Sequence, residues 1–186
     1  WEAWAGRYLA VLGSSILLPS GVTSDAIAKS DAADAPQFLS LTCHFDAKSP
    51  TSTSLLEMGL AGVQEAISML PATVPFNVTI VSDMISSDFE TRFRKSWGKI
   101  YPGRELTGSI SCCEALSFDW LEERLKNPVF DIDLILILQS QGAEQYSDAL
   151  AAMVLTSDDV AEKYQLSHSA RILRPMPLDM TNFRAD

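Results

Sequence analysis

Apolar residues follow two distinct patterns in the clearest parts of this sequence. Over 54–70 they recur at intervals of three and four, which places them on one face of a helix. Ser54 and Glu57 fit a capping box at its start, and Pro71 ends it. Over 132–138 every residue except Asp133 is apolar, which is typical of a strand buried on both faces of a sheet.

The remaining segments continue this alternation of strands and helices. Alternating or β-rich apolar runs predict strands over 39–45, 76–82, 106–113, 149–155 and 170–176. Helical spacing predicts helices over 1–12, 87–100, 114–126 and 157–165. Strands separated by helices predict an α/β fold with a mixed, mainly parallel sheet and helices on both faces.

The predicted elements suggest a division near residue 37. Residues 1–36 contain the first short helix, then Pro19, Gly21 and an Ala/Asp-rich stretch that resembles a surface connection. We therefore expect an N-terminal helical arm and linker over 1–36 and the α/β domain over 37–186.

Charge and hydropathy exclude two classes of partner. The chain has 24 acidic against 14 basic side chains and a formal net charge of −10, which would repel nucleic acid. The apolar runs are too short for a membrane span, which needs about 20 residues. We expect a cytoplasmic location, although a chain beginning with Trp1 leaves an upstream signal or anchor open.

Cys112 and Cys113 are the candidate nucleophiles. They precede a predicted helix, whose unpaired N–H groups would favour a thiolate, while neighbouring Glu114 would oppose one. The simpler interpretation is that both are small, partly buried structural residues at a strand-to-helix junction. A cysteine enzyme also needs a base, and His44 and His168 are the two histidines in the sequence.

Other polar residues are better explained by structure than by chemistry. Asp46, Asp83 and Asp133 lie near strand ends, where aspartates commonly form caps or turns. The two adjacent cysteines lack further ligands at zinc-site spacing, and Gly59 and Gly62 form no phosphate loop. We therefore expect no catalytic, metal or cofactor site, and assign both glycines to close helix packing.

One helix offers a candidate partner surface. Phe89, Phe93 and Trp97 lie one turn apart, with Arg92 among the basic residues between them. The simplest interpretation, however, is that the three aromatic residues belong to the core.

The sequence resembles part of a known enzyme fold over 112–155. Cys112, Cys113 and Glu114, the apolar strand at 133–137 and the small-residue strand at 147–155 resemble one half of a thiolase-like domain, the fold of ketoacyl synthases. In that family a nucleophilic cysteine starts a buried helix. Gln139 and Ser140 replace the family's glycine pair, and no matching catalytic histidine or lysine follows. The resemblance implies a thiolase-like half whose active site is lost.

A second resemblance covers more of the chain. Arg7-Tyr8-Leu9, Leu17-Leu18-Pro19, the central β-α-β unit and the closing segment at 170–176 resemble the type VI lipase adapter family of bacterial secretion systems. This resemblance implies a protein that binds an effector lipase, a secretion spike protein or both, without catalysis.

These observations favour a non-enzymatic adapter or accessory protein. Two alternatives stay open: a thioester-handling enzyme using Cys112 or Cys113, and an immunity or inhibitor protein whose acidic surface covers a basic site.

Overall fold

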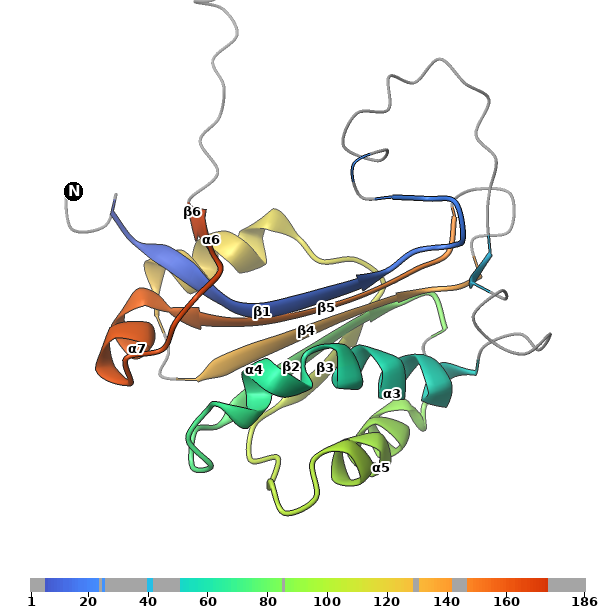
Figure 1. Cartoon of the computed structure of the whole chain (residues 1–186), viewed down its shortest axis with the longest axis horizontal. Helices are drawn as coiled ribbons and strands as arrows, with labels where there is room; N and C mark the ends of the chain where they lie inside the picture. The colour runs from blue at the N-terminus through green and yellow to red at the C-terminus, as the bar shows by residue number, and fades with distance from the viewer. Residues whose placement is uncertain are drawn as a thin grey trace, which may run out of the picture.

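The protein is built on a single sheet with helices on both sides (Figure 1). A computed structural model describes residues 6–23, 25, 40–41, 51–84, 86–128, 131–141 and 147–173. Within them, six strands pair in the order β3-β2-β4-β5-β1-β6. Their bounds are β1 Tyr8–Leu17, β2 Phe76–Ser82, β3 Ile110–Cys113, β4 Ile132–Gln139, β5 Ala149–Ser157 and β6 Ala170–Leu173.

The sheet is mixed, and its parallel pairings lie at one side. β2 runs parallel to both β3 and β4, because helices connect β2 to β3 and β3 to β4. The pairings β4–β5, β5–β1 and β1–β6 are antiparallel. The α/β class and the mixed sheet are confirmed, and the parallel character is confined to β3, β2 and β4.

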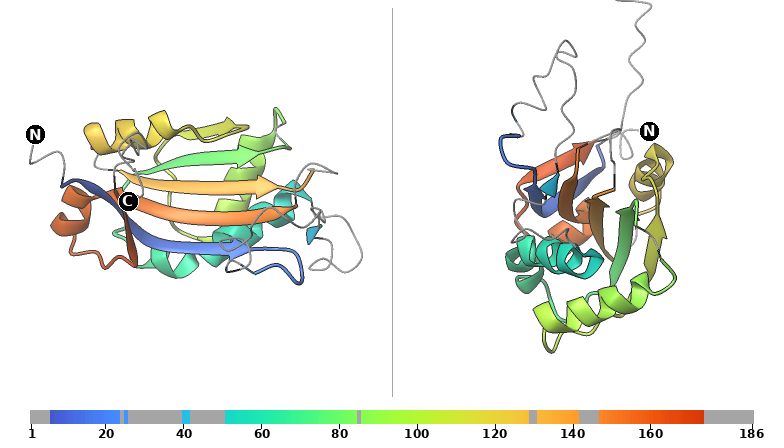
Figure 2. Two further views of the ribbon diagram at one scale, coloured as in Figure 1. Left: turned by 90° about the horizontal axis from the view of Figure 1, so that it is seen from above. Right: turned by 90° about the vertical axis from the view of Figure 1, so that its right-hand side faces the viewer.

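Helices cover the two faces of the sheet unequally (Figure 2). The helices are α3 Ser52–Gly62, α4 Gln64–Ser68, α5 Phe89–Ile100, α6 Phe118–Lys126 and α7 Asp158–Lys163. The larger core lies on the side of α3 and α5, which pack over β2, β4 and β5. On the opposite side, α6 closes a small cluster of Leu9, Val11, Leu125, Ile135 and Leu155. The predicted helices on both faces are therefore present.

The predicted N-terminal helix is wrong where the structure describes it. Residues 8–17 form β1, which lies between β5 and β6 and has a bulge between Val11 and Gly13. Leu9 and Val11 are buried in the smaller cluster, so the pairing with two strands overrides the apparent helical spacing. The division at residue 37 therefore separates β1 from the sheet to which it belongs.

The longest predicted helix is confirmed, with a shifted start and a break. The capping box consists of Thr51 and Ser54: the Ser54 backbone N–H donates to Thr51 Oγ1 at 3.1 Å, and the Thr51 N–H donates to Ser54 Oγ at 2.9 Å. Val63 then separates α3 from α4. A Cβ on Gly62 would lie 2.3 Å from Ser15 Oγ, which supports its assignment to close packing.

Other local predictions vary in accuracy. The buried strand predicted over 132–138 is β4, in the middle of the sheet. The helix predicted over 87–100 is α5, which begins without a side-chain cap because Asp88 pairs with Arg92. The strand predicted over 39–45 lies outside the described residues except for residues 40 and 41. No helix in the described ranges is long and apolar enough to cross a membrane.

Candidate functional site

The two candidate nucleophiles lie on the edge strand β3. Cys112 is exposed and Cys113 is partly buried. Successive residues of a strand point to opposite faces, so the two thiols do not face one common site. Although the Cys112 side chain is exposed, the protein around its sulfur partly desolvates it and so raises its pKa, and neighbouring Cys113 and Glu90 raise it further. A raised pKa disfavours the thiolate that would act as the nucleophile.

The expected position of these cysteines at a helix N-terminus is wrong. α6 begins at Phe118, four residues beyond Glu114, rather than directly after Cys113. Its N-cap is Ser117, whose Oγ accepts the Trp120 backbone N–H at 3.3 Å. Residues 114–117 therefore separate both thiols from the positive end of the helix dipole.

The histidine that the structure describes lies at the opposite side of the sheet from these cysteines. His168 lies two residues before β6, and β6 and β3 are the two edge strands of the sheet. Its Nε2 accepts a hydrogen bond from Arg171 Nε at 3.1 Å, and its ring centroid lies 5.6 Å from that of Tyr8. It therefore cannot serve as the base for either cysteine. His44 lies outside the described residues.

The strand-end aspartates have structural partners. Asp83 follows β2, and its Oδ2 accepts the backbone N–H groups of Ser140 and Gln141 at 2.9 and 2.6 Å. Asp83 therefore links the C-terminal ends of the neighbouring strands β2 and β4. Asp46 lies outside the described residues.

Asp133 forms a buried ion pair beneath α6. Its Oδ1 lies 2.6 Å from Arg124 Nη2. Burial raises the pKa of Asp133 to about 6, because it outweighs the opposite effect of Arg124. No group of three or more His, Cys, Asp or Glu residues that could hold a metal ion occurs among the described residues.

The predicted partner surface on α5 is wrong for its aromatic members. Phe89, Phe93 and Trp97 are all buried in the main core. Trp97 packs edge-on against Phe76 and donates its Nε1–H to the Arg104 carbonyl at 2.9 Å. Arg92 is exposed, but it pairs with Asp88 at 2.7 Å. The simplest interpretation, that the three aromatic residues belong to the core, is confirmed.

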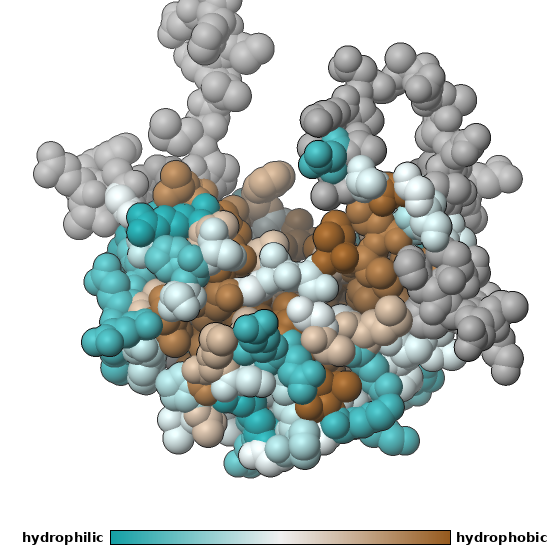
Figure 3. Space-filling model, viewed as in Figure 1, coloured by the Kyte–Doolittle hydropathy of each residue, from teal (hydrophilic) through white to brown (hydrophobic). Residues whose placement is uncertain are grey.

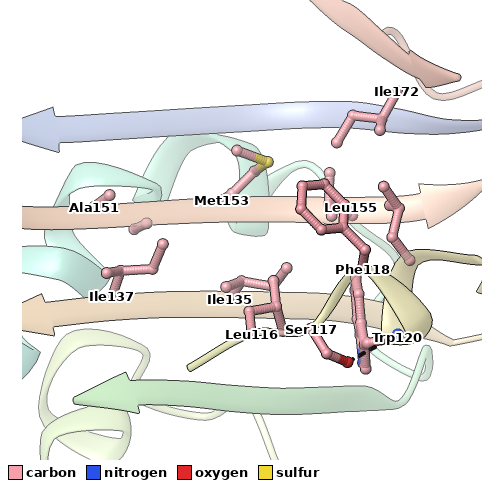
Figure 4. Close-up of a pocket in the computed structure, with 12 residues that line it drawn as sticks. Leu116, Ser117, Phe118, Trp120, Ile135, Ile137, Ala151, Met153, Leu155 and Ile172 are labelled. Atoms are coloured by element: carbon pink, nitrogen blue, oxygen red, sulfur yellow. Dashed lines mark hydrogen bonds between the residues drawn. The ribbon is translucent and has the colours of Figure 1, made fainter. Parts of the chain in front are cut away.

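An apolar groove lies instead between the start of α6 and the sheet (Figure 4). It has a volume of about 300 Å³. We call its wall and floor the α6 face, which consists of Leu116, Phe118, Trp120, Ile137, Ala151 and Met153. Phe118 is 78% exposed, and Leu116 beside it is 37% exposed. In Figure 3, which has the same view as Figure 1, hydrophobic side chains gather along the upper side of the molecule, the side of the sheet on which α6 lies.

Phe118 was not identified as a functional residue from the sequence. It lies three residues before Leu121 and seven before Leu125, and so belongs to the stripe that a helix normally buries. In the structure Leu125 is buried, whereas Phe118 at the first turn remains exposed. The difference in exposure between Phe118 and Leu125 depends on how α6 lies on the sheet, which the spacing of residues along the helix does not indicate.

The α6 face continues onto the neighbouring strand. Ile137 of β4 pairs with Ala151 of β5, and Ala151 pairs with Ile16 of β1. Residues directly opposite in antiparallel strands point to the same face, and Ile16 is 56% exposed. This row therefore extends the uncovered apolar surface across three strands.

Comparison with known proteins and solved structures identifies the fold of this chain but no family to which it belongs. No family model matches the sequence, and no curated protein matches it. AntDE, a type II polyketide ketosynthase in complex with its acyl-carrier protein AntF, matches with a TM-score of 0.52 and 13% identity. The match covers 89% of this chain and 62% of that chain.

Two further structures are condensing or acyl-transfer enzymes. The acyltransferase ChlB3 has a TM-score of 0.49 and 14% identity, over 80% of this chain and 50% of that chain. The 3-oxoacyl-[acyl-carrier-protein] synthase III from Aquifex aeolicus VF5 has a TM-score of 0.43 and 11% identity, over 80% of this chain and 53% of that chain.

The similarity to AntDE supports the thiolase-like fold expected from the sequence. At 13% sequence identity this similarity shows the fold alone. The chain spans between one half and two thirds of the length of the three proteins. None of the three is a secretion adapter, so they give no support to the type VI resemblance.

Proposed function

We propose that this chain is a thiolase-like domain that acts by binding a partner protein through the α6 face. The observation that carries this proposal is the exposed Phe118 beside an open apolar groove. Contiguous exposed apolar surface costs free energy in water, and large patches of it commonly mark interaction sites. Aromatic residues are also enriched among the side chains that contribute most to binding.

The positions of the cysteines support binding rather than catalysis. A cysteine enzyme needs a base within hydrogen-bond reach of its sulfur, and donors for the oxyanion that forms. Cys112 has a raised pKa and lies on the edge strand β3, whereas His168 lies beside β6 at the opposite edge of the sheet. The more specific hypothesis, a partner that is a secreted lipase or a secretion spike protein, rests only on the sequence resemblance.

Site-directed cross-linking tests the proposed binding face. We expect a photoreactive benzoyl-phenylalanine at position 118 to cross-link a discrete protein in the cell that produces this chain. The matched control places the same residue at Met69, which is 68% exposed at the end of α4, away from the α6 face. Gel mobility and mass spectrometry provide the readout. Equal cross-linking from both positions would contradict a specific role for the α6 face.

A second candidate function is favoured by the fold comparison. The similar structure with a TM-score of 0.52 contains a ketosynthase, so the chain is also a candidate thioester-handling enzyme that uses Cys112 or Cys113. The fold likeness supports this enzyme candidate more than it supports an adapter, and the exposed groove supports binding.

Replacing both cysteines separates the two candidates. We expect the Cys112→Ser, Cys113→Ser variant to keep its melting temperature within a few degrees, because Cys112 is exposed and serine is similar in size. Cross-linking from position 118 and function in the host should also persist. Loss of host function with an unchanged melting temperature and unchanged cross-linking would instead support the enzyme.

A further inference from the structure

The outer side of α6 is acidic. Asp119 and Glu123 lie one helical turn apart at exposed positions of α6, and Glu122 between them is partly buried. The basic residues of α6 are already engaged with carboxylates: Arg124 with Asp133 at 2.6 Å, and Lys126 with Glu122 at 3.2 Å. An occupant lying along α6 would therefore meet negative charge beside the apolar groove.

The two strands that form most of the floor of the groove, β4 and β5, offer no free strand edge to an occupant. β4 pairs with β2 and β5, and β5 pairs with β4 and β1, so the two strands that form most of the floor have neighbours on both sides. Ser117 Oγ already accepts the Trp120 N–H. An occupant that lies over β4 and β5 must therefore satisfy its own backbone groups, which a helix does and an isolated extended strand does not.

We propose that the α6 face binds a basic amphipathic helix of another protein. This inference rests on the proposed function and specifies the chemistry of its partner. Apolar residues of that helix would fill the groove beside Phe118, and its lysines or arginines would lie opposite Asp119 and Glu123. A second copy of this chain is a poorer occupant, because each copy has a net charge of −10.

Two labelled peptides test the charge and the shape of the partner separately. Both are helices of about 18 residues with the same leucine stripe; one has lysine and the other glutamate at the remaining positions. Fluorescence anisotropy measures their binding to the whole chain at several salt concentrations. We expect the lysine peptide to bind at least about tenfold more tightly, and its affinity to fall as salt rises.

Matched variants locate the binding site. Phe118→Ser should weaken the lysine peptide about tenfold, whereas Met69→Ser, at another exposed apolar residue, should change little. Asp119→Asn with Glu123→Gln should weaken it several-fold and flatten its salt dependence. Glu65→Gln with Glu162→Gln removes two exposed charges from α4 and α7 and should have a smaller effect. Circular dichroism establishes that each variant is folded.

The possible failures are distinguishable. Equal affinities for the two peptides, both weakened by Phe118→Ser, would overturn the basic partner while supporting the proposed binding face. Affinities that do not change in Phe118→Ser would overturn both proposals. A wild-type dimer in sedimentation that becomes a monomer in Phe118→Ser would identify a second copy as the occupant and overturn the basic helix.

Discussion

An Ile135→Asp variant is expected to lose its cooperative fold. Ile135 is 5% exposed near the middle of β4, where it packs in the smaller cluster with Leu9, Val11 and Leu155. Burying a carboxylate there costs several kcal/mol, a large part of the roughly 5–15 kcal/mol that stabilises a typical domain. Arg124 on the same side of β4 is already paired with Asp133, so the new carboxylate would compete for it.

Urea unfolding followed by circular dichroism measures the effect. Ile135→Val removes one methyl group and should cost about 0.5–1.5 kcal/mol. Ile16→Asp places the same charge on the same face of the sheet, but at a residue that is 56% exposed, and should leave the protein folded. A soluble Ile135→Asp variant with a cooperative transition near that of wild type would contradict the buried position of β4.

The elements with local signals were predictable from the sequence. Six of the seven residues at 132–138 in β4 are apolar, with Asp133 as the exception, and a strand of this composition fits only where both faces are covered. Ser157 precedes two aspartates, and in the structure its Oγ accepts the Val160 N–H at the start of α7. Such features depend on residues that are close together in the chain, and they can therefore be predicted from the sequence.

Features that depend on distant pairings were not predictable. β1 contains Gly13, Ser14 and Ser15, and its strand conformation is set by β5 and β6, whose residues lie more than 130 positions later. The start of α6 shifted because Ser117 caps it, leaving residues 114–117 in a connection. This shift moved the cysteines away from the expected helix end.

The candidate site illustrates the same limit. Sequence spacing placed Phe89, Phe93 and Trp97 on one side of a helix but could not tell whether that side meets the core or solvent. The structure buries all three and leaves Phe118 exposed. Which apolar stripe remains uncovered depends on how much of each sheet face the helices reach, and residue spacing along one helix does not contain that information.

Arg124→Met is expected to destabilise the protein much more at pH 8 than at pH 5. Burial raises the pKa of Asp133 to about 6, while Arg124 lowers it and Asp131 raises it. An unfolded aspartate has a pKa of about 3.9. The stability that the bound proton gives the native state is therefore fully present below pH 3.9 and is lost as the pH rises through 6.

Removing the Arg124 guanidinium would raise the pKa of Asp133 further, so the loss of stability would continue above pH 6. At pH 8 the variant must bury an unpaired carboxylate or bind a proton, which costs roughly 3–5 kcal/mol. At pH 5 Asp133 is mostly protonated in both proteins, so most of this difference should disappear. Methionine keeps an apolar side chain beside Trp120, which limits the loss of packing.

Urea unfolding at both pH values measures this difference. Arg124→Lys keeps the positive charge and should recover part of the stability at pH 8. Arg94→Met removes an exposed i,i+4 partner of Glu90 and should cost about 0.5 kcal/mol or less at either pH. Equal losses for Arg124→Met at pH 5 and pH 8 would mean that the charge on Asp133 contributes nothing to holding α6 on the sheet, and that packing alone positions the wall of the groove.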